Sequence, residues 1–77
     1  MHSFIDQQRF VLAVGDTVDG VAEDAGVKVL NRLERVVLIE TSYRIAVQLR
    51  HTPDVIVHIF ERETDARRAF ELFRPQQ

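Results

Sequence analysis

The sequence predicts an α+β fold with the element order strand, helix, strand, strand, helix, strand, helix. Three observations support this order: short runs of β-branched and aromatic residues, intervening segments with apolar residues at helical spacing, and glycine or proline between them. A chain of 77 residues encloses only one hydrophobic core, so we expect a single domain over residues 1–77.

The first strand and helix are predicted from residues 10–26. Phe10–Val14 is an uninterrupted apolar run that Gly15 ends, which is typical of a buried strand. Asp16 is the expected N-cap of the helix and Asp19 its first-turn acid, with Gly26 expected just after the helix end. Apolar residues at spacing i, i+3, i+4, i+7 form its inner face: Val18, Val21, Ala22 and Ala25.

A β-hairpin is predicted next, turning near Glu34 and Arg35. The odd positions Val27, Val29 and Leu33 alternate with polar residues, which indicates a strand with one solvated face, and Asn31 is the exception on the inner side. Val36–Ile39 is a second β-branched run only a few residues later. The two runs are therefore expected to pair.

A second helix is predicted from Tyr43 to about His51, capped by Thr41 or Ser42. Its inner face is expected to carry Ile45, Ala46 and Leu49. Pro53 prevents its continuation because proline disfavours the helical conformation of the residue before it.

The last strand and helix follow. Val55–Phe60 is the last strand, with Val55, Val57 and Ile59 on one face and Ile56, His58 and Phe60 on the other. Thr64 is the expected N-cap of a final helix that Pro75 ends. The inner face of that helix consists of Ala66, Ala69, Phe70 and Phe73.

Together these elements predict a ferredoxin-like βαββαβ antiparallel sheet over residues 9–61 with an additional C-terminal helix over residues 64–74. Both crossover helices are expected on one face of the sheet. The other face is then left for the C-terminal helix, a second copy of the chain or a partner protein.

Composition excludes several classes of function. The net charge is -2 with acidic and basic residues interspersed, which argues against nucleic-acid binding. The chain has no cysteine and no basic-then-apolar leader, so we expect a cytoplasmic protein without disulfides or a thiolate nucleophile. No apolar run approaches the roughly 20 residues of a membrane-spanning helix.

The sequence predicts neither an enzyme nor a cofactor or metal site. His2, His51 and His58 lack the spacing of a helical metal-ligand pair, and ordinary structural roles explain them better. Ser42 is better explained as a helix cap than as a catalytic nucleophile. Gly15-Asp16-Thr17 joins a strand to a helix but has no lysine and carries an acid, so a turn is favoured over a phosphate loop.

Residues 9–60 resemble the subtilisin propeptide and peptidase inhibitor family. Phe10–Val14 is similar to the opening strand of that family, Gly26–Leu30 to its second strand, and Ala46, Leu49, Pro53 and Val55 to its helix-to-strand corner. Val36–Ile39 and His58-Ile59 depart from the family pattern, as does the helix expected after Glu63 in place of an extended tail. The resemblance implies a propeptide-like module that inhibits or chaperones a subtilisin-type protease by docking its open sheet face.

Two functional hypotheses follow. The first is a non-catalytic protein-binding module of this propeptide-like kind. The second is a self-associating structural or regulatory domain that dimerises through its sheet face and C-terminal helix. The first places the partner contact at Ile56, His58 and Phe60, and the second adds the C-terminal helix. The candidate partner-binding residues are therefore Ile56, His58, Phe60, Phe70 and Phe73.

Overall fold

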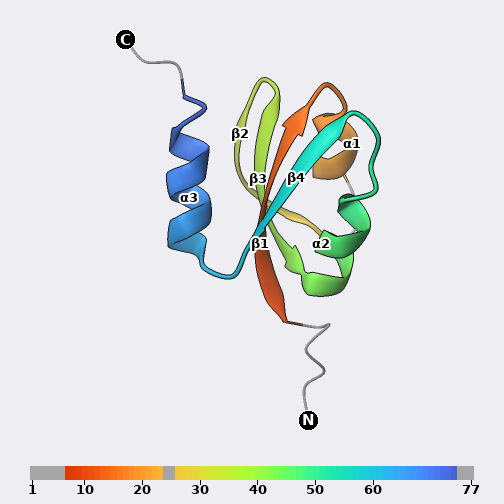
Figure 1. Cartoon of the computed structure of the whole chain (residues 1–77), viewed down its shortest axis with the longest axis vertical. Helices are drawn as coiled ribbons and strands as arrows, with labels where there is room; N and C mark the ends of the chain where they lie inside the picture. The colour runs from red at the N-terminus through yellow and green to blue at the C-terminus, as the bar shows by residue number, and fades with distance from the viewer. Residues whose placement is uncertain (1–6, 24–25, 75–77) are drawn as a thin grey trace.

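The computed structural model describes residues 7–23 and 26–74, and it shows a small α+β domain with a four-stranded antiparallel sheet and three helices (Figure 1). The strand order across the sheet is β2-β3-β1-β4. The elements in chain order are β1 (Gln8–Gly15), α1 (Val18–Ala22), β2 (Lys28–Leu33), β3 (Val36–Ser42), α2 (Tyr43–Leu49), β4 (Val55–Phe60) and α3 (Glu63–Glu71).

The two central strands are β1 and β3, which pair antiparallel with Val11 opposite Ile39. Both are buried on their two faces, which explains why their sequences are continuous apolar runs without polar alternation. On its other side β1 pairs antiparallel with β4, placing Val11 opposite Ile59.

One face of the sheet is covered by α1 and α2. Val11 and Ala13 of β1 and Val37 and Ile39 of β3 form a buried cluster with residues of both helices. The helix residues in this cluster are Val18, Val21, Ala46 and Leu49, as the helical spacing predicted.

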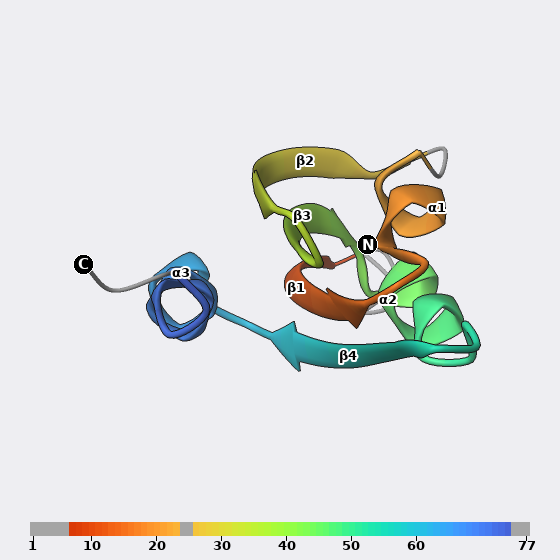
Figure 2. The same ribbon diagram turned by 90° about the horizontal axis from the view of Figure 1, so that it is seen from above.

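The opposite face is covered by α3. Figure 2, which views the molecule from above, shows α3 on the other side of the sheet from α1 and α2. Phe70 is only 1% exposed and packs with Phe10, Leu12 and Leu38. The sequence left this face to the C-terminal helix, a second copy or a partner protein, and in the structure the C-terminal helix covers its centre.

A β-bulge in β2 overturns the predicted alternation of that strand. The pairing shifts between Val29 and Asn31, so that Val29 lies opposite Ile39 and Leu33 lies opposite Val36. Because one extra residue reverses the face of everything after it, Leu33 packs under α3 with Val36, not beside Val27 on the other face.

Helix capping agrees with prediction for α2 and differs for α1 and α3. The Ser42 hydroxyl accepts a hydrogen bond from the Ile45 N–H at 3.3 Å. The N-cap position of α1 is Thr17, which makes no side-chain capping hydrogen bond, and Asp16 forms an ion pair with Arg35 at 2.7 Å. The N-cap of α3 is Arg62, so Thr64 lies inside that helix. Ala25 and Pro75, which were assigned to helix α1 and to the end of α3, lie outside the described residues.

Two contacts fix where β4 begins. Gly15 at the end of β1 has φ +154°, and a Cβ there would lie 2.2 Å from the carbonyl oxygen of Asp54. The Thr17 hydroxyl donates to the Pro53 carbonyl at 3.0 Å. The loop after α2 is thus held against the β1–α1 corner, which sets the register of β4.

Candidate protein-binding surface at strand β4

The outer strand β4 exposes an apolar side chain on the face that α3 covers elsewhere. Ile56 is 64% exposed and His58 is also exposed, whereas Phe60 is half-buried against the cluster around Phe70. The exposure of Ile56 is unusual because its ladder partner, Val14, belongs to that cluster. Helix α3 therefore covers β1 and β3 but stops short of the middle of β4.

The five residues predicted to contact a partner fall into three places. Ile56, His58 and Phe60 share one face of β4, as expected from their even numbering. Phe70 is inside the core, where it has no exposed surface to offer. Phe73 is 44% exposed and lies away from β4, in a hollow of about 410 Å³ that it lines with Leu33–Val36.

The outer edge of β4, called here the β4 edge, is the side of Val55–Phe60 that faces away from β1. Among the described residues β4 pairs only with β1, and Figure 2 shows no other described element beyond it. A hollow of about 310 Å³ is lined by Arg50 and by Val57, His58, Ile59 and Phe60. Because these β4 residues come from both faces, the hollow follows the edge itself.

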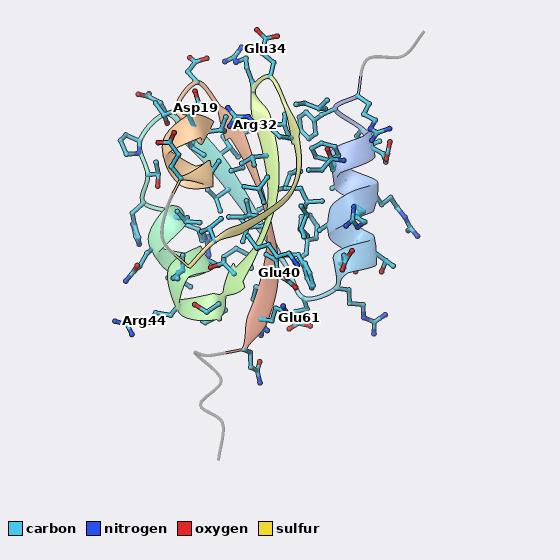
Figure 3. All side chains as sticks on the ribbon, turned by 180° about the vertical axis from the view of Figure 1, so that it is seen from behind. Asp19, Arg32, Glu34, Glu40, Arg44 and Glu61 are labelled. Atoms are coloured by element: carbon cyan, nitrogen blue, oxygen red, sulfur yellow. The ribbon has the colours of Figure 1, made fainter. Side chains whose placement is uncertain are left out.

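The opposite edge of the sheet, β2, carries features that discourage pairing with another strand. It has the bulge at Val29–Asn31 and the charged residues Lys28 and Arg32. Figure 3 shows Arg32 directed toward Asp19 of α1, with which it forms an ion pair. Strand β4 has an unbroken register with β1 and no charged residue or proline between Val55 and Phe60.

Charged residues flank β4 at both ends. Asp54 precedes it in a turn with φ +64°, and Arg62 follows it as the N-cap of α3. Both are exposed, and neither forms an ion pair within the described part of the chain.

At the Phe60 end, Glu61 has a partner on the first strand. Its carboxylate lies 4.0 Å from the Arg9 guanidinium, and Arg9 stacks 5.3 Å from the ring centroid of Tyr43. The Arg9 side chain is only 15% exposed. The Arg9 side chain therefore lies between the residue that follows β4 and the start of α2, and the cation–π contact orients it there.

Among residues 7–23 and 26–74, no group of three or more histidine, cysteine or acidic side chains is placed to hold a metal ion. His2 lies outside the described residues. None of the described helices is both long and apolar enough to span a membrane.

Comparison with known proteins found no matching family model, curated protein or solved structure. The arrangement of β4 therefore has to be interpreted from its own geometry. Sequence reasoning selected Ile56, His58 and Phe60 but missed Asp54 and Arg62, which stand at equal sequence separations on either side of His58. The equal spacing of Asp54 and Arg62 around His58 is visible in the sequence. It becomes relevant to binding only because the structure places β4 at an edge of the sheet.

Proposed function

We propose that this chain is a ferredoxin-like, non-catalytic domain that binds protein through β4, with Ile56, His58 and Phe60 at the contact. The strand order β2-β3-β1-β4, with both crossover helices on one face, supports the ferredoxin-like part of this proposal. The observation that carries the binding function is the β4 edge, which pairs with no strand of the described residues other than β1 and which carries the exposed Ile56.

Docking of an extended protein segment at this edge follows from ordinary strand chemistry. A peptide that adds to an exposed edge gains main-chain hydrogen bonds and places alternate side chains against the exposed face of the sheet. Here Ile56 and the half-buried Phe60 would receive those side chains, and the hollow beside Arg50 would receive the others.

The propeptide-like hypothesis requires the sheet face beyond Ile56, His58 and Phe60 as well. It places a protease on the sheet face opposite α1 and α2, where α3 packs through Ala66 and Phe70. Because Phe70 is fully enclosed, a protease would have to displace the whole helix before docking there. The β4 edge needs no such displacement, and for this reason we place the protein-binding function at the edge.

A selection of displayed peptides tests the proposed function. We expect extended apolar peptides to be enriched on the wild-type domain and to lose binding to Ile56→Asp. Val29→Asp is the matched control, since it introduces the same charge at an exposed apolar residue of the opposite edge strand. Enrichment that is equal on both variants would place binding elsewhere and overturn the proposal.

A further inference from the structure

We infer that the partner at β4 is a second copy of this chain, whose β4 pairs antiparallel with the first across a twofold axis at His58. This inference rests on the proposed function and names its partner. Pairing of this kind would join the two four-stranded sheets into one continuous sheet.

The possible registers are few. A twofold axis that relates neighbouring antiparallel strands stands perpendicular to the sheet, so each residue faces one on the same side of the sheet. Residues on the same side of β4 have numbers that differ by an even amount. The midpoint between two facing residues is therefore itself a residue, and the axis passes through it. For β4 the central candidates are Val57 and His58.

The apolar side chains favour the axis at His58. In that register Ile56 faces Phe60 of the other copy, and Val57 faces Ile59. The most exposed apolar residue of the strand thus meets an aromatic ring that is only half-buried. Aromatic–β-branched pairs of this kind stabilise antiparallel sheets. With the axis at Val57, Ile56 would face His58 instead.

The flanking charges select the same register. Asp54 lies four residues before His58 and Arg62 four residues after it, just outside the two ends of β4, so an axis at His58 brings the two opposite charges to the same end of the paired strands, once at each end. Both side chains are exposed and without an ion-pair partner in the described part of the domain. With the axis at Val57, Asp54 would face Phe60. The β4 edge is therefore complementary to itself in apolar contact and in charge.

Only one of the two sheet edges is suited to this pairing. The β2 edge has a bulge that interrupts its register, and with an axis at Leu30 Lys28 would face the like charge of Arg32 of the other copy. The β4 edge has neither. We therefore expect dimers and no further growth of the sheet through β2.

Cysteine cross-linking tests the register directly, because the chain has no cysteine of its own. Residues that face each other in antiparallel strands have Cα atoms about 4.5–5.5 Å apart, within the range that a disulfide spans. We expect His58→Cys to form a disulfide-linked dimer under mild oxidation. Val57→Cys tests the alternative axis. Asp65→Cys, at an exposed position of α3, measures cross-linking by random collision. Both should cross-link more slowly than His58→Cys.

Charge reversal tests the end contacts. Arg62→Asp places a second carboxylate opposite Asp54, and we expect the dimer dissociation constant measured by sedimentation to rise about tenfold at low salt. Asp54→Asn added to that variant removes the repulsion and should recover part of the loss, while asparagine still tolerates the positive φ. Arg62→Asp keeps the domain folded, because aspartate is a preferred N-cap for α3.

Two results would overturn the inference. One is a monomeric wild-type chain at millimolar concentration with no faster cross-linking of His58→Cys than of Asp65→Cys. The other is faster cross-linking of Val57→Cys than of His58→Cys. A monomer that still selects peptides in an Ile56-dependent manner would reject the second copy while supporting the proposed binding function, so the two failures are distinguishable.

Discussion

Leu12 and His58 lie opposite each other in the β1–β4 ladder, yet Leu12 is 1% exposed and His58 faces solvent. Helix α3 covers the central strands and leaves the middle of β4 open, so burial falls sharply between two neighbouring strands. Leu12 therefore supports folding, whereas His58 and Ile56 are available for binding.

This difference predicts unequal stability costs for truncation. Leu12→Ala should lower the free energy of unfolding by about 2–5 kcal/mol, because it leaves a cavity under α3. Ile56→Ala should change it by no more than about 0.5 kcal/mol at micromolar concentration. Urea denaturation measures both, and similar losses would show that Ile56 is packed.

The two phenylalanines of the C-terminal segment should also differ. Phe70→Ala removes a ring that is 1% exposed, at a cost of about 3–5 kcal/mol. Phe73 is 44% exposed and lies beyond α3, so Phe73→Ala should cost less than about 1.5 kcal/mol. Thermal unfolding of the two variants side by side is the measurement. A greater loss for Phe73→Ala would contradict the placement of α3.

Glycine replacements should have opposite signs at two positions. Gly15→Ala would bring a Cβ within 2.2 Å of the Asp54 carbonyl oxygen, so the β1–β4 junction must open. We expect a loss above about 1 kcal/mol. Gly20 lies in α1, where an added Cβ would meet no atom within 4 Å, and Gly20→Ala should stabilise the domain by about 0.5–1 kcal/mol. Chemical denaturation of the pair decides the matter, and a stabilising Gly15→Ala would refute the close contact.

Capping predicts a further difference between α2 and α3. Ser42→Ala removes the hydrogen bond to the Ile45 N–H and should cost about 0.5–2 kcal/mol. Thr64→Ala is the control, because Thr64 lies inside α3 and should be neutral within about 0.5 kcal/mol. Equal losses in the unfolding free energy would restore Thr64 as the cap.

The sequence by itself determined the order of strands and helices and most of the core. Phe10–Val14 and Val36–Ile39 are continuous apolar runs because both faces of their strands are buried. A run of consecutive apolar residues can be recognised from a short stretch of sequence alone. The inner faces of α1 and α2 were readable for the same reason, since helical spacing places Val18, Val21, Ala46 and Leu49 on single stripes.

Only the tertiary structure decided on which face of the sheet Leu33 packs and which residue pairs with Asp16. It also decided how much of the second sheet face is covered. Leu33 changed sides because a bulge depends on the pairing of two strands, and Asp16 turned to Arg35 because the hairpin tip lies beside it. The aromatic stripe of α3 was visible in sequence, but how far the helix reaches across β4 was not. That reach leaves Ile56 and His58 exposed, since coverage depends on distances between elements that no local pattern records.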